Sequence, residues 1–122
     1  MLDDLYELIG GRRTILAATD SFYRRVQADE TLRHFFESSD MANLRSRQSM
    51  FISMLLGGRV VYTGKEIGPA HAHARVLGLN NAHFDAFLKH FRAALDEVGV
   101  KAEPAEKVMK LLESKRGLVL NY

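Results

Sequence analysis

Apolar residues recur at spacings of three and four along most of the chain, which is the period of a helix with one buried face. Five stretches share this pattern: 5–9, 14–28, 41–56, 81–98 and 104–117. The segment 59–66 alternates too little to indicate a strand and is predicted to be an irregular loop. The pattern therefore predicts an all-α fold.

Residues that cap or break helices set the expected boundaries. The expected stops are glycines, at Gly10–Gly11, Gly57–Gly58, Gly78, Gly99 and Gly117. The expected starts are the N-cap segment Ser38–Asp40, either Asn80 or Asn81, and Pro104, whose fixed φ suits a first turn.

Pro69 and Gly78 bound a further short helix, which carries His71 and His73. Positions two apart on a helix point about 200° away from each other, at 100° per residue. The two imidazoles therefore cannot share one small target inside the fold. At most one of them is a buried ligand, and geometry alone leaves the choice open.

Two polar side chains fall on apolar faces. Tyr23 lies on the buried face of the 14–28 helix, and Gln48 interrupts the inward stripe of the 41–56 helix, which reads Met41, Leu44, Gln48, Phe51 or Ile52, and Leu55. Leaving a buried amide unpaired costs about 1–3 kcal/mol. Gln48 therefore either bonds another buried polar group or receives a ligand.

Composition narrows the protein class. The 122 residues, 47% of them hydrophobic, predict one domain over 1–122. Fifteen acids are interspersed among seventeen bases, so no basic stripe indicates nucleic acid. The absence of cysteine excludes disulfides and cysteine–zinc sites. Neither a signal sequence nor a long apolar run is recognisable, and we expect a cytoplasmic protein with no membrane association.

The candidate chemistry is limited by elimination. The histidines and acids lack the spacing of a metal cage, no nucleophile and base can be paired, and no phosphate-binding glycine motif is present. One inward histidine, two polar tips and many phenylalanines fit a planar apolar cofactor with one axial ligand. The alternative is a helical interaction module without cofactor, in which these residues are only core.

These residues resemble the truncated haemoglobins, most closely their group I. The resemblance covers nearly the whole chain and rests on an ordered set of short motifs: Leu5–Gly11, Phe22-Tyr23, Phe35-Phe36, 41–51, Gly57-Gly58, Tyr62-Thr63-Gly64, Ala70-His71 and His83-Phe84-Asp85. It implies a globin-like fold, a truncated two-over-two helical sandwich around haem. Groups II and III usually keep a pocket tryptophan, which this chain lacks.

The resemblance implies a role for each polar candidate. His71 would bind the haem iron on the proximal side, with His73 as the fallback. Tyr23 and Gln48 would be the distal hydrogen-bond donors and the groups that assist catalysis. Arg47 would face the pocket mouth and pair with a propionate. Some members carry a second axial histidine at this position, and an arginine there cannot bind the iron in that way.

By the same comparison, Leu44 stands where other globins often carry a distal histidine, and Phe36 packs on the porphyrin face. Four further phenylalanines would line the pocket: Phe51, Phe84, Phe87 and Phe91. Ile52 stands where some nitric-oxide-consuming members have a gating phenylalanine.

The implied cofactor is haem b, iron protoporphyrin IX, and the implied ligands are O₂, NO and other small diatomic molecules. The leading activity is nitric oxide dioxygenation, in which O₂ and NO give nitrate and an external reductase restores ferrous iron. The alternative is a non-enzymatic haem protein that binds or senses O₂ or sulfide without turnover. A monomer or weak dimer is expected.

Overall fold

The computed structural model describes residues 5–36, 40–56 and 75–120, and every regular element in those ranges is a helix. In chain order the elements are α1 (Leu5–Leu8), α2 (Gly11–Ala28), the 3₁₀ helix η1 (Arg33–Phe36), α3 (Met41–Leu55), α6 (Asn81–Glu97), α7 (Ala102–Glu113) and α8 (Arg116–Leu120). The predicted all-α fold is confirmed. In this part of the chain no helix is long and apolar enough to cross a membrane.

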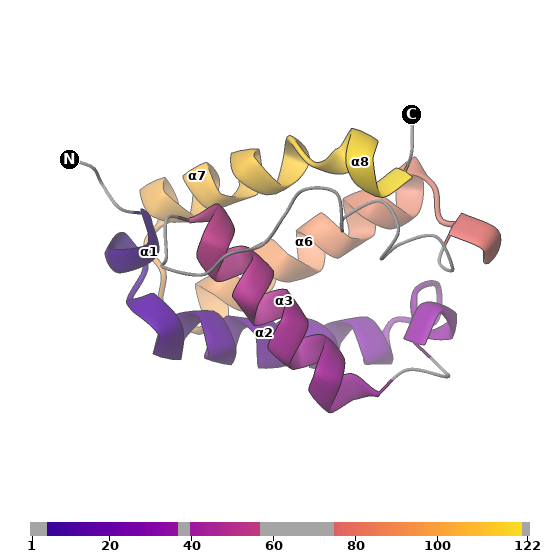
Figure 1. The fold of residues 1–122 in the computed structure, drawn as a ribbon, viewed down its shortest axis with the longest axis horizontal. Coiled ribbons are helices and arrows are strands. Elements are labelled where there is room, and N and C mark those ends of the chain that lie inside the picture. The colour runs from indigo at the N-terminus through magenta and orange to yellow at the C-terminus, as the bar shows by residue number, and fades with distance from the viewer. Residues whose placement is uncertain (1–4, 37–39, 57–74, 121–122) are drawn as a thin grey trace.

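The long helices form two stacked pairs. Figure 1 shows α3 crossing α2 in one pair, and α6 and α7 running antiparallel in the other. Contacts between α2 and α6 join the pairs. The side chains with almost no exposure come from both: Ile15, Val26, Ile52, Leu95 and Val108. This two-over-two arrangement confirms the predicted sandwich.

The first two helices meet at a turn that only glycine adopts without strain. Gly10 has φ of 113°, and a Cβ built there would lie 2.2 Å from the Thr14 Oγ1 atom. The turn is completed within Gly10–Gly11, so α2 starts at Gly11. The predicted start at Thr14 is therefore wrong, because the glycine pair opens the helix as well as ending the previous one.

The short helix α1 is tied to the far end of α3. The Tyr6 backbone N–H donates to the Leu56 carbonyl at 2.8 Å, across a long sequence separation. A helix of four residues is not stable by itself. Its position therefore depends on this bond and on contacts with α2 and α7.

Most predicted helix ends are found. The Asn43 N–H donates to the Asp40 side chain at 3.2 Å, and Asn80 caps α6. Gly78 and Gly99 take left-handed φ values of 99° and 89° directly after helical segments. Four predicted features lie outside the described residues: the caps at Ser38 and Ser39, the stop at Gly57–Gly58, the 59–66 loop and the start at Pro69.

The C-terminal part is two helices, and the prediction of one helix ended by Gly117 is wrong. The first, α7, ends at Glu113, and Gly117 lies inside α8. At the break, the Ser114 hydroxyl donates back to the Leu111 carbonyl at 2.5 Å. Arg116 then bonds both Glu113 and Asp85 of α6, which fixes the start of α8.

Polar bonds fix the join between α2 and α6. Glu97 accepts from the Ser21 hydroxyl at 2.7 Å and from Arg25 at 2.8 Å, and these bonds together with Arg24 lower the pKa of Glu97 to about 2. The His90 ring lies 2.8 Å from the Asp29 carboxylate. Both ends of the contact are thereby cross-linked.

Candidate functional site

Aromatic rings gather where α2, η1 and α6 meet. The Phe22 ring is their hub, with centroids 5.1 Å from Tyr23, 5.5 Å from Phe91 and 6.1 Å from Phe87. Phe36 completes the cluster, 6.0 Å from Phe87. The sequence analysis included Phe22 in the motif Phe22-Tyr23 but did not identify it as part of the site. Periodicity assigns a residue to a face and not to a contact.

The Tyr23 side chain is held by aromatic contacts on two sides. Phe22 meets its ring at an interplanar angle of 64°, and Phe36 lies 5.7 Å away at 80°. Such edge-to-face contacts fix ring orientation as well as burying area. The predicted burial of Tyr23 is confirmed, since only 8% of the residue is exposed.

The Tyr23 hydroxyl makes no hydrogen bond to any of the described residues. Burial raises its pKa above the ordinary value, and the positive charge of Arg47 lowers that pKa part of the way back. The group is therefore a neutral phenol at physiological pH. A buried donor of this kind carries a desolvation cost that a polar ligand would relieve.

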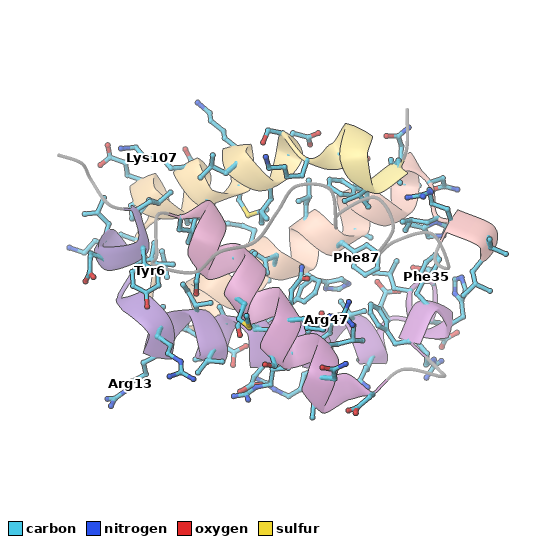
Figure 2. The ribbon with its side chains drawn as sticks, viewed as in Figure 1. Tyr6, Arg13, Phe35, Arg47, Phe87 and Lys107 are labelled. Carbon is cyan, nitrogen blue, oxygen red and sulfur yellow. The ribbon has the colours of Figure 1, made fainter. Side chains whose placement is uncertain are left out.

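Three predicted site residues lie on α3 and differ in exposure. Leu44 packs against the core and is half-buried. Gln48 is also half-buried, less than its stripe position predicted, and within the described ranges its amide has no hydrogen-bond partner. Arg47 is exposed, and Figure 2 shows it on the side of α3 where Phe87 lies.

Among the described side chains of α3, the buried ones are Ser49, Ile52 and Ser53, and Leu56 is buried directly after the helix. Ile52 was one of two alternatives at its place in the predicted stripe, and its burial confirms that alternative. Ile52 is thus a core residue, with 2% exposure. The stripe side chains outside the described residues are Met41, Phe51 and Leu55.

Phe84 starts the phenylalanine face of α6 and is buried under a cation. The Arg116 guanidinium carbon lies 4.6 Å from its ring centroid. Hydrogen bonds from Arg116 to Glu113 and Asp85 hold the guanidinium in place. Phe84 therefore joins α6 to α8 and belongs to the same hydrophobic core as Phe22 and Phe91.

The aromatic cluster continues towards the surface. Phe35 lies 6.1 Å from Phe87 and packs edge-on against His83 at 5.0 Å. His34 covers its other side at 4.0 Å. The adjacent aromatics Phe35 and Phe36 both belong to the 3₁₀ turn η1 and both contact Phe87.

Three predicted site residues cannot be placed. His71, the expected iron ligand, and its neighbour His73 lie outside the described residues, and so does the side chain of Phe51. In the ranges that are described, no three His, Cys, Asp or Glu side chains form a metal-binding group.

The residues that are described fit a flat apolar group with a polar ligand. Tyr23 and Phe22 gather with Phe36, Phe87 and Phe91, Leu44 packs against the same core, and Phe84 lies beneath Arg116. The Tyr23 hydroxyl, buried and without a partner among the described residues, is the strongest sign of a ligand, because protein interiors rarely leave a donor unsatisfied. The haem that the resemblance implies is compatible with this set.

Comparison with known proteins gives consistent results. The model of the bacterial-like globin family matches residues 4–121. A group 1 truncated hemoglobin of Tetrahymena pyriformis is 38% identical over 112 residues, which are 92% of this chain and 90% of that protein. Its crystal structure in the Fe(III) form superposes with a TM-score of 0.88 at 37% identity, over 97% of this chain and 98% of that one. The 2/2 hemoglobin of Synechococcus sp. PCC 7002, in the cyanomet state with covalently attached heme, gives 0.91 at 31% identity over 98% and 100%.

Proposed function

Since the chain belongs to the bacterial-like globin family, and within it to the group 1 truncated haemoglobins, it binds small ligands through haem, and we propose that it converts NO and O₂ to nitrate. In this reaction one O₂ and one NO give one nitrate while ferrous iron of the bound haem becomes ferric, so an external reductase must return one electron. We further propose haem b as the cofactor, a cytoplasmic location and a monomer or weak dimer.

The Tyr23 hydroxyl carries the proposal. It is buried and has no partner among the described residues, and its ring is fixed between Phe22 and Phe36. It is thus a preorganised donor for a ligand that takes on negative charge. Such a donor contributes about 1–3 kcal/mol when it does not have to leave another partner.

The residues of α3 supplement this donor. The Gln48 amide, which has no hydrogen-bond partner among the described residues, would supply a second N–H, and Leu44 packs apolar surface against the core. Arg47 places a positive charge near the Tyr23 hydroxyl and, as an exposed side chain at the edge, would pair with a propionate. A pocket that holds O₂ this firmly favours a reaction on O₂ over its delivery.

The remaining roles follow from family membership. His71 would bind the iron on the proximal side, with His73 as the alternative. Phe36, Phe87 and Phe91 would contact the macrocycle together with Phe51, and Phe84 would support the wall from its place under Arg116.

The direct test is the reaction itself. Reduced, haem-loaded protein equilibrated with O₂ is mixed with one equivalent of NO, and nitrate is measured together with the absorbance of ferric haem. About one nitrate per haem is expected, formed as fast as the ferric spectrum appears. If the spectrum changes without nitrate, the chain binds or senses its ligand without this turnover.

The iron ligand is tested by a matched pair of variants. His71→Ala should abolish the normal Soret band on haem addition, whereas His73→Ala should retain it. A normal band in His71→Ala with loss in His73→Ala would exchange the two roles. Normal binding in both variants would remove the short helix from the haem site.

A further inference from the structure

The first turn of α6 is closed by a histidine. The His83 backbone N–H donates to the Asn80 side-chain oxygen at 3.2 Å, and the Asn80 backbone N–H donates to His83 Nδ1, also at 3.2 Å. This is a reciprocal capping box, in which Glu or Gln ordinarily holds the position that His83 occupies.

The geometry fixes the tautomer of His83. A backbone N–H can only donate, so Nδ1 must present its lone pair, and the ring proton of the neutral form is on Nε2. Protonation would place a second proton on Nδ1 and remove the acceptor. It would also bring a positive charge to a helix N-terminus, where the helix dipole opposes it.

A second imidazole lies beside the first. The His34 ring of η1 is 6.1 Å from His83, and both side chains are half-buried and reachable by solvent. The charged residue closest in sequence to His83 on α6 is Asp85, whose carboxylate pairs with Arg116 of α8, and Arg116 also bonds Glu113 of α7. Two imidazolium ions at this separation would repel.

This turn supports the aromatic cluster. Phe84 follows His83 directly, and Phe35 lies between the two imidazoles and Phe87. Phe87 in turn contacts Phe36, which fixes the Tyr23 ring. Loosening of the first turn of α6 would therefore weaken the packing of the residues that surround the Tyr23 hydroxyl.

We propose that His83 is a proton-controlled latch, meaning that its charge decides whether the first turn of α6 holds the aromatic cluster in place. Neutral His83 closes the first turn of α6 and holds Phe35 against Phe87. Protonation of His83 opens the turn, and a charge on the neighbouring His34 would add repulsion. Acidification thereby loosens the packing of the aromatic cluster while the rest of α6 stays folded.

The test is hydrogen exchange in the haem-loaded, CO-bound protein. Protection factors for the amides of residues 84–87, which correct for the intrinsic effect of pH, are measured at pH 8 and pH 5.5. In the unmodified protein they should fall about tenfold, as expected for loss of a cap and repulsion by the dipole. Amides of residues 92–96 should change little.

Matched variants isolate the histidine. His83→Gln keeps an acceptor for the Asn80 N–H but cannot gain a charge, so its protection at 84–87 should change less than twofold. His90→Gln removes a histidine from the same helix outside the cap and should behave like the unmodified protein. Asn80→Ala should show low protection at both pH values.

Two results would overturn the latch: constant protection in the unmodified protein, or an equal fall in His83→Gln. Neither depends on nitrate formation, so the latch and the proposed reaction can fail separately.

Discussion

Replacing Tyr23 by phenylalanine should have opposite effects on ligand retention and on folding stability. The change removes the hydroxyl and leaves the ring contacts with Phe22 and Phe36 in place. Only one buried donor is lost, and no described protein group has to find a new partner.

The expected size of both effects follows from the lack of a described protein partner for the Tyr23 hydroxyl. A hydrogen bond to a ligand in a buried pocket is worth about 1–3 kcal/mol, and each 1.4 kcal/mol is a factor of about ten in a rate that breaks the bond. The O₂ dissociation rate should therefore rise about tenfold or more. Without a ligand the hydroxyl is buried and has no partner among the described residues, so its removal should leave the free energy of unfolding unchanged or raise it by up to about 1 kcal/mol.

Two measurements check the prediction. Stopped-flow mixing of the oxygenated protein with excess CO gives the O₂ dissociation rate, and urea unfolding of the ligand-free protein gives its stability. Tyr6→Phe is the matched control, because Tyr6 lies on α1, well away from Arg47 and Phe87 in Figure 2. This control should leave the dissociation rate unchanged.

An unchanged dissociation rate in Tyr23→Phe would show that the hydroxyl is not a donor to the ligand. A rise in the rate accompanied by a loss of several kcal/mol in unfolding free energy would assign Tyr23 a structural role instead.

Three further predictions concern the fold. Gly10→Ala should lower the unfolding free energy by about 2 kcal/mol and Gly99→Ala by about 1 kcal/mol, measured by urea titration. Both glycines have a positive φ, but only at Gly10 would the new Cβ clash with Thr14. Equal losses in the two variants would contradict the clash. Arg116→Gln should lower the free energy of unfolding by about 1–2 kcal/mol, because it removes the contact with Phe84 and the bonds to the carboxylates. The control Arg92→Gln removes an exposed ion pair and should lower it by less than about 0.5 kcal/mol. Similar losses in both variants would show that Arg116 does not link α6 to α8. Hydrogen bonds from His90 and Thr31 lower the pKa of Asp29 from 3.8 to about 2, so Asp29 stabilises the fold above pH 4 and this stabilisation is lost as the pH falls from about 4 to 2. In Asp29→Asn the unfolding free energy should therefore fall less steeply with acid than in the unmodified protein. An equally steep fall would refute the pairing.

The sequence predicted the long helices because their boundaries are local. Asn80 caps α6 through bonds within its own first turn, and Gly99 takes the left-handed conformation that ends the helix segment before it. Gly117 misled the prediction, because the actual break before Arg116 depends on Asp85, which is distant in sequence.

The site was predictable to the level of faces. The position of Tyr23 on an apolar face indicated its burial, and the structure confirms it. The contacts of Phe22 with rings of α6 were not predictable, because they depend on how two helices cross. Gln48 is less buried than expected, while Ser49 and Ser53, which a count of apolar residues overlooks, are buried on the same helix.

The bond between Tyr6 and Leu56 also bears on the order in which the molecule folds. It closes a long loop around α2 and α3, and such contacts gain nothing until the elements between them are in place. We therefore expect α1 to dock after the transition state for folding, so that weakening it would speed unfolding and leave the folding rate nearly unchanged. The first residues of the chain would then set how long the molecule stays folded.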